Sequence, residues 1–113
     1  MAWRRGDVVL VDFPFVDRFG SKHRPALIVS GGNYHSERHR DVIVAVTSTQ
    51  VHKYRGSTDY LLNDWQTAGL SQPSVVRSTL LTILSARISR RIGHLSDADL
   101  GQVELRLKTS LEL

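Results

Sequence analysis

Cysteine is absent from this sequence, which excludes disulfide bonds and thiolate metal ligands. Long apolar runs are absent too, because no stretch approaches the roughly 20 residues that a helix needs to cross a bilayer. The arginines near the start, Arg4 and Arg5, are not followed by an apolar segment. We therefore expect no secretory signal, no membrane association and a cytoplasmic protein.

Sequence motifs of metal and cofactor chemistry are missing as well. Gly31-Gly32 lacks the continuation of a phosphate-binding loop, and no Gly-x-Ser-x-Gly segment occurs. The five histidines are scattered. His35 and His39 would share a face only on a helix, whereas the polar residues 31–40 predict a loop. We expect no metal site and no cofactor.

Basic residues are plentiful and give the chain a net charge of +4 and a pI near 10. They gather in three expected loop regions, each with an aromatic residue: Arg18, Phe19, Lys22, His23 and Arg24; Tyr34, His35, Arg38, His39 and Arg40; His52, Lys53, Tyr54 and Arg55. Cations beside stacking rings are typical of proteins that bind single-stranded nucleic acid. Solvated loops can have the same composition.

Short apolar and β-branched segments predict most of the secondary structure. They indicate strands over residues 6–13, 25–29, 41–48, 57–62, 74–85 and 90–95. Pro25 has no backbone N–H, which fits the first position of its strand.

The only helix expected follows Ser96, a suitable N-cap, with Asp99 in the capping-box position and Leu95 and Leu100 placed as a hydrophobic staple. Its apolar stripe is predicted to face the sheet and its charged face to meet solvent; the stripe is Leu100, Val103, Leu107 and Leu111, and the charged face is Glu104, Arg106, Lys108 and Glu112. The 113 residues thus predict a single domain (1–113) of mainly β (α+β) class. Five to six short strands should form a small closed or nearly closed barrel, because closure removes exposed edges, and the C-terminal helix caps it.

Two features indicate a site for chemistry. The first is Arg24, which a strand would hold stiffly while its planar fork of N–H donors meets a phosphate. An ordinary surface ion pair is the alternative. The second is the hydroxyl run Thr47-Ser48-Thr49 at the end of an apolar strand, although such runs often satisfy backbone groups in turns. Arg77 interrupts another apolar run and is either an exposed cation or a ligand-binding residue.

These segments together resemble the MazF/PemK toxins of bacterial toxin–antitoxin systems. The matching segments follow the family's order and cover nearly the whole chain: 5–12, 24–29, 42–48, 59–61, 69–70, 74–77, 81–83 and 92–95. The resemblance implies an SH3-like β-barrel, a homodimer and a cognate antitoxin that occupies the basic groove. It also implies a sequence-specific, metal-independent endoribonuclease that cuts single-stranded RNA. The ribose 2′-OH would attack the adjacent phosphorus and leave a 2′,3′-cyclic phosphate and a 5′-OH.

The resemblance also assigns residues. The family's catalytic arginine falls on Arg24 and its catalytic threonine on Ser48, with Thr47 or Thr49 in that role if the register slips by one. No glutamate precedes Arg24, so we expect the arginine chiefly to stabilise charge on the phosphorane. Histidine is a residue type suited to proton transfer, but His23 and Arg24 are adjacent in a strand and point to opposite faces, which argues against a part for His23. RNA contacts are expected from Lys22, His23, Thr47, Thr49, Gln50, Lys53, Arg55 and Arg77.

Two other functions stay open from the sequence. A CcdB-like gyrase-inhibiting toxin resembles the same fold but acts through residues at its chain end, typically including a tryptophan. This sequence ends in Ser110-Leu111-Glu112-Leu113, which favours the ribonuclease. A non-catalytic SH3-like binding module is the second alternative.

Overall fold

The computed structural model describes residues 3–13, 22–37 and 40–113, without the side chain of Lys22. The basic residues Arg18, Arg38 and His39 and the aromatic residue Phe19 lie outside the described residues. The described elements are β1 (Asp7–Phe13), β2 (Lys22–Ile28), α1 (Gly32–Glu37), β3 (Asp41–Ser48), β4 (Tyr60–Leu61), β5 (Val75–Leu84), a 3-10 turn (Ser85–Arg87), β6 (Ile88–His94) and α2 (Asp97–Leu111). None of the described helices is long and apolar enough to cross a membrane.

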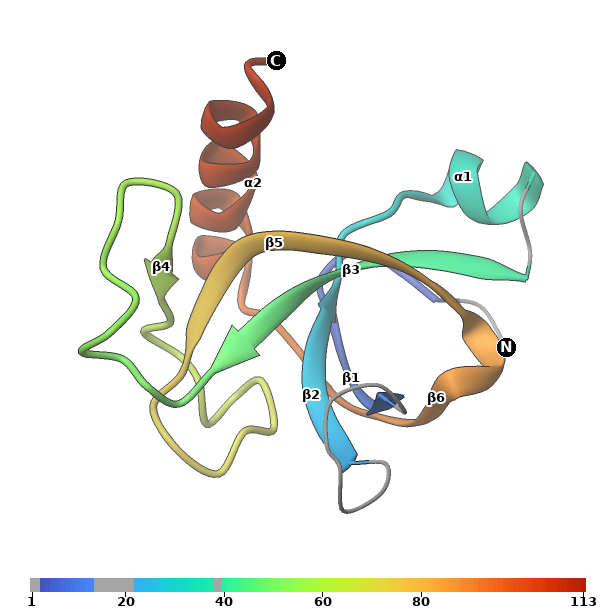
Figure 1. Cartoon of the computed structure of the whole chain (residues 1–113), viewed down its shortest axis with the longest axis horizontal. Coiled ribbons are helices and arrows are strands. Elements are labelled where there is room, and N and C mark those ends of the chain that lie inside the picture. The colour runs from blue at the N-terminus through green and yellow to red at the C-terminus, as the bar shows by residue number, and fades with distance from the viewer. Residues whose placement is uncertain (1–2, 14–21, 38–39) are drawn as a thin grey trace.

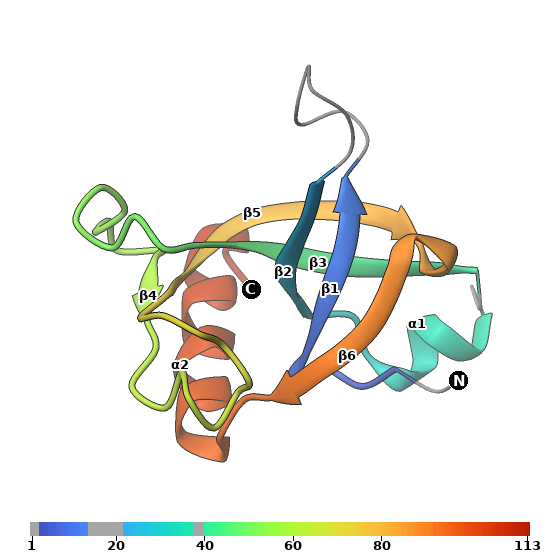
Figure 2. The ribbon, with the colours of Figure 1, turned by 90° about the horizontal axis from the view of Figure 1, so that it is seen from below.

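One antiparallel sheet organises the molecule. In the described residues it has six strands in the order β4-β5-β3-β2-β1-β6. The sheet is strongly curled, so that β1 and β2 run across the long strands β3 and β5 (Figures 1 and 2). Its edge strands β4 and β6 are not paired with each other in the described part of the chain. The mainly β fold with a C-terminal helix is confirmed, and the sheet is open rather than fully closed.

Both faces of the central strands are buried, which explains their continuous apolar sequences. Inside the curl, Val9 and Val11 of β1 pack with Ile28 and Val44. On the other face, Val8 packs under α2 and the 62–74 segment in a second cluster whose members include Leu27, Ala45, Leu62, Leu70, Leu95 and Val103. The second cluster therefore packs the 62–74 segment and α2 against the face of the sheet that contains β2 and β3.

The predicted position of Pro25 is wrong, because β2 begins at Lys22 and Pro25 is its fourth residue. Pro25 pairs with Leu10 of β1, while the pairing of β2 with β3 ends at Ala26. The Pro25 carbonyl accepts a hydrogen bond from Thr47 Oγ1, so the missing N–H of Pro25 falls on the β3 side, beyond that pairing. Pro25 therefore costs no ladder hydrogen bond.

The loop predicted for residues 31–40 is also wrong, because Gly32–Glu37 form helix α1. No residue of α1 is buried, so the sequence shows none of the apolar periodicity that would reveal a helix. Polar contacts hold it instead: His35 Nδ1 lies 2.8 Å from the Trp3 carbonyl oxygen, and Nε2 lies 2.5 Å from Ser30 Oγ.

The other boundaries are close to those predicted, with two differences. β4 keeps only Tyr60–Leu61 of the predicted 57–62 strand, and β6 starts at Ile88 rather than at residue 90. Helix α2 begins as predicted, with the Ser96 hydroxyl accepting a hydrogen bond from the Asp99 N–H.

The predicted roles of two side chains in α2 are corrected. The Asp99 carboxylate is fully buried and accepts hydrogen bonds from Tyr60 and from the backbone of residues 63 and 64, rather than completing a capping box. At the other end of the stripe Leu111 is exposed, since the helix extends past the sheet there.

Candidate nucleic-acid cleft

A cleft of about 430 Å³ lies beside the first half of β2, the end of β3, β6 and the 62–74 segment. Its lining combines two arginines, several hydroxyls and two glutamines with apolar side chains. The lining residues are Leu10, Arg24, Pro25, Thr47, Ser48, Thr49, Gln50, Gly69, Leu70, Ser71, Gln72, Ser74, Arg90 and Ile92. Arg24 and Ser48, which the sequence selected, thus line the same cleft.

Arg24 is held by its backbone and is exposed at its side chain. It pairs with Val11 in the β1–β2 ladder, and Val11 is fully buried. Among the described residues no acceptor engages the Arg24 guanidinium, so the predicted alternative of an ordinary ion pair finds no partner there. A stiffly mounted guanidinium whose donors meet no acceptor in the described part of the chain suits a phosphate ligand.

The hydroxyl groups beside Arg24 are not equivalent. Thr47 Oγ1 donates to the Pro25 carbonyl at 2.8 Å, so its proton is used within the fold. Ser48 Oγ accepts from the Gln50 N–H at 3.0 Å, which leaves the Ser48 proton available to a ligand. The last β2–β3 pair joins Ala26 to Val46, and two further steps in that register lead to Arg24 and Ser48.

Irregular pairing in β5 accompanies a second cationic group. The β3–β5 register shifts between Ala45 and Thr47, whose partners are Leu80 and Val76, so Arg77 lies in the bulged stretch. The Arg77 guanidinium stacks 3.8 Å from the centre of the Tyr54 ring, and Lys53 Nζ lies 5.3 Å from the same ring. These three residues do not line the cleft but form a cation-bearing aromatic surface between β5, which carries Arg77, and the loop after β3, which carries Lys53 and Tyr54.

The remaining predicted contacts are dispersed. Arg55 is exposed on the loop that carries Tyr54, and His23 is exposed on β2 opposite Asp12. His23 is not among the residues that line the cleft. The side chain of Lys22 lies outside the described part of the structure.

Sequence reasoning missed two parts of the cleft, namely Arg90 and the segment from Gly69 to Ser74. Arg90 pairs with Leu10, next to a register shift between Leu10 and Val11 that re-aims side chains at this point of β6. No feature of the local sequence marks such a bulge. The turn residues Ser71-Gln72-Pro73 gave a visible loop signal, but their contact with β2 and β3 depends on long-range pairing.

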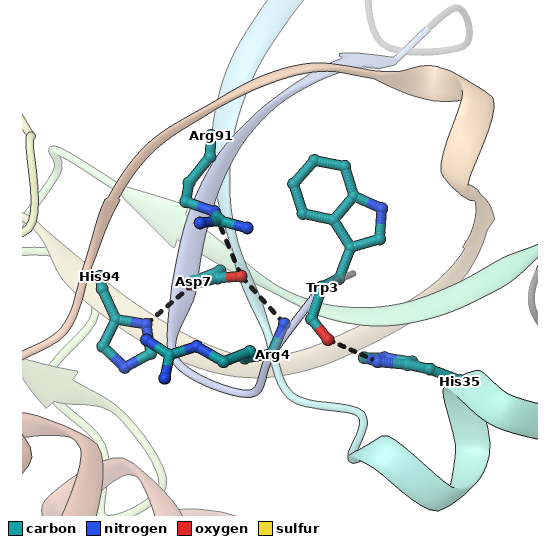
Figure 3. Close-up of polar contacts among 6 residues, drawn as sticks. All are labelled: Trp3, Arg4, Asp7, His35, Arg91 and His94. Carbon is teal, nitrogen blue, oxygen red and sulfur yellow. Dashed lines mark hydrogen bonds and ion pairs between the residues drawn. The ribbon is translucent and has the colours of Figure 1, made fainter. Parts of the chain in front are cut away.

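A polar cluster around the buried Asp7 at the start of β1 was missed too (Figure 3). Asp7 is fully buried, and its carboxylate meets the Arg4 N–H at 2.9 Å, His94 Nδ1 at 2.8 Å and Arg91 Nε at 3.4 Å. These contacts join the chain before β1 to the end of β6. None of these four residues lines the cleft, so the cluster is a structural joint. No group of three or more histidine, aspartate or glutamate side chains within the described ranges is arranged to hold a metal.

The described residues thus form a small curled β-sheet with a C-terminal helix and a cleft that carries two arginines and several hydroxyls. The chain belongs to the family described as the PemK-like, MazF-like toxins of type II toxin–antitoxin systems, whose family model matches residues 4–111. A comparison with curated protein sequences gave no match.

Solved structures of similar fold include proteins from mycobacteria and from Deinococcus radiodurans. A mycobacterial endoribonuclease in complex with its cognate antitoxin has a TM-score of 0.77 and 21% identity, covering 99% of this chain and 97% of that one. The Mycobacterium tuberculosis toxin MazF-mt6 has a TM-score of 0.73 and 24% identity, over 95% and 97% of the two chains. MazF from Deinococcus radiodurans has a TM-score of 0.71 and 19% identity, over 100% and 99%. These similarities support the fold across the full chain.

Proposed function

We propose that this toxin is a sequence-specific endoribonuclease that cuts single-stranded RNA in the cleft, with Arg24 and Ser48 as its catalytic residues. The observation that carries the proposal is that the Arg24 guanidinium, which has no acceptor among the described residues, and a serine hydroxyl with an available proton line one cleft in a chain of this toxin family. Similar structures are named endoribonucleases, which agrees with the proposal.

The proposed reaction is an internal transfer at phosphorus. The ribose 2′ oxygen forms a bond to the adjacent phosphorus while the bond from phosphorus to the 5′ oxygen breaks, giving a 2′,3′-cyclic phosphate and a 5′-OH. Water in the open cleft takes the 2′ proton and protonates the 5′ oxygen. Arg24 stabilises the added negative charge in the transition state, and Ser48 donates a hydrogen bond to a phosphate oxygen. His23 lies outside the lining and is given no part.

The RNA contacts proposed from the sequence divide into two groups. Thr47, Thr49 and Gln50 line the cleft and would meet the nucleotides at the cleaved bond. Lys53, Arg77 and Arg55 would bind the strand farther along, where Tyr54 offers a stacking ring beside two cations. His23 and Lys22, beside Arg24 in the chain, complete the proposed set.

Partners and location follow from the family. We propose a homodimer in the cytoplasm, neutralised by a cognate antitoxin that covers the basic cleft. Similar toxins from mycobacteria and Deinococcus radiodurans were solved with antitoxins, which supports an antitoxin partner. The CcdB-like and non-catalytic alternatives are not favoured, since the matching family model is that of PemK-like, MazF-like toxins.

Replacement of Arg24 tests the proposal. Arg24→Ala should lower the cleavage rate of a mixed RNA pool by about 10²–10³-fold, the usual cost of losing an electrostatic stabiliser of the transition state. Arg40→Ala, which removes an exposed arginine outside the cleft, serves as the charge-matched control and should retain activity. Near-normal cleavage by Arg24→Ala would contradict the assigned site. Cleavage should persist in EDTA.

A further inference from the structure

One wall of the cleft carries no charge. The segment between Leu62 and Ser74 contributes Gly69, Leu70, Ser71, Gln72 and Ser74 to the lining, beside the wall that carries Arg24 and Ser48. Ser71 and Gln72 are exposed at the cleft and have neutral hydrogen-bonding side chains. Such groups add little attraction for phosphate, which all RNA sequences share, but they can distinguish one base from another.

The segment is closed and tied to helix α2. The Leu62 N–H donates to the Ser74 carbonyl at 3.0 Å, so the two ends of the loop meet. The buried Asp99 carboxylate accepts from the backbone N–H groups of Asn63 at 3.2 Å and Asp64 at 2.8 Å. A charged acceptor with several donors holds the start of the loop firmly.

The loop is also pressed against β6. Gly69 has a positive φ of 84°, and a Cβ placed there would lie 2.0 Å from the Ile92 carbonyl oxygen. Ala68 is fully buried, and Leu70 is nearly so. The main chain at Gln72 is fixed further by its carbonyl, which accepts from Ser74 Oγ at 2.9 Å. Ser71 and Gln72 therefore project from a rigid backbone into the cleft.

We propose that the 62–74 loop is the base-reading wall of the cleft, with Gln72, assisted by Ser71, as the specificity-determining residue for the RNA that is cut. The inference rests on the proposed ribonuclease function and goes beyond it by assigning the choice of sequence. A glutamine amide offers a donor and an acceptor together, which matches the edge of an unpaired base. A rigid mount is what makes such a contact selective, since a mobile amide would adapt to any base.

Sequencing of cleavage ends tests this assignment. The unaltered protein, Gln72→Ala and Gln72→Glu are incubated with an RNA pool of random sequence, and the fragments with 5′-OH ends are sequenced. In Gln72→Ala the preference for one base at one position of the cleaved sequence should fall by about tenfold, which is the discrimination expected of a good amide–base contact. Gln72→Glu, which keeps the shape but removes the donors, should shift the preferred base at that same position.

Gln66→Ala is the matched control, since Gln66 is exposed in the same loop but does not line the cleft. It should keep the preference of the unaltered protein. An unchanged preference in both Gln72 variants, or an equal change in Gln66→Ala, would overturn the assignment while leaving ribonuclease activity intact. Failure of the unaltered protein to cut any RNA would overturn the proposed function, and this inference with it.

Discussion

Side chains of the same chemical kind have different parts in this cleft because of what they already bind. Thr47 and Ser48 are neighbours at the end of β3, yet Thr47 donates to the Pro25 carbonyl and Ser48 only accepts from the Gln50 N–H. A hydroxyl with its proton committed to the fold has little left for a phosphate. The hydrogen bonds thus favour Ser48 over Thr47, which sequence alignment alone left open.

Substitution of each hydroxyl in turn separates these roles. Ser48→Ala should lower the rate of RNA cleavage by about 10²-fold, and Ser48→Thr should preserve most of it, because the hydroxyl is retained. Thr47→Ala should lower the free energy of unfolding by about 1 kcal/mol through the lost hydrogen bond, with a smaller effect on the rate of RNA cleavage. An inactive Thr47→Ala beside an active Ser48→Ala would show that the assignment is off by one residue.

Titration of Tyr60 tests the hydrogen bonds that the buried Asp99 carboxylate accepts from Tyr60 and from the start of the 62–74 loop. Burial and the hydrogen bond to the Asp99 carboxylate raise the pKa of Tyr60 from 10.0 to about 12. Because the folded state holds this proton more tightly than the unfolded chain, the stabilisation is complete below pH 10 and is lost as the pH rises through 12.

Denaturant unfolding of the native protein and of Tyr60→Phe, at several pH values, measures this effect. The native protein should be the more stable below pH 10, and the difference should shrink between pH 10 and 12. A difference in the free energy of unfolding that stays constant from pH 10 to 12 would contradict the hydrogen bond between Tyr60 and Asp99.

At the scale of elements, the decisive contact is the one between the 62–74 loop and β6. The backbone passes so closely that a Cβ on Gly69 would lie 2.0 Å from the Ile92 carbonyl oxygen, and one on Gly93 would lie 2.1 Å from the Ala68 carbonyl oxygen. Two glycines far apart in sequence are therefore required for one contact. This contact holds the loop, which forms one wall of the cleft, against β6.

Two glycine substitutions should have opposite effects on stability. Gly69→Ala should lower the free energy of unfolding by roughly 2 kcal/mol or more, since alanine disfavours a positive φ and would also clash. Gly101→Ala should raise it by about 0.5–1 kcal/mol, because Gly101 lies within α2 and a Cβ there meets nothing within 4 Å. Chemical denaturation of the two variants checks both signs, and a stable Gly69→Ala would refute the close approach.

The sequence predicts the parts of the site that depend on neighbouring strands. Arg24 and Ser48 could be placed together because β2 and β3 follow each other in the chain and each carries its own apolar pattern. Arg90 could not, since its place depends on the pairing of the first strand with the last and on a register shift. Helix α1 could not be predicted for a different reason: polar contacts of His35, rather than a buried apolar stripe, stabilise it.

At the scale of the whole molecule, one curled sheet provides a rigid frame and leaves the cleft where β2 begins and β3 ends. No activated side-chain nucleophile is evident among the residues that line it. Internal attack by the substrate needs none, and positioning of the 2′-OH can by itself remove roughly 7–11 kcal/mol of the barrier. A cleft that offers one guanidinium and one hydroxyl at the phosphate is then sufficient.

The most direct test of this account uses a substrate with one altered sugar. An RNA that contains a preferred cleavage site is compared with the same RNA carrying a single 2′-deoxy sugar just upstream of the scissile phosphate. The account predicts that both bind with similar affinity and that only the all-ribose RNA is cut, with or without EDTA. Cleavage of the deoxy-substituted RNA at that bond would contradict the account, since water or another nucleophile would then be the attacking group.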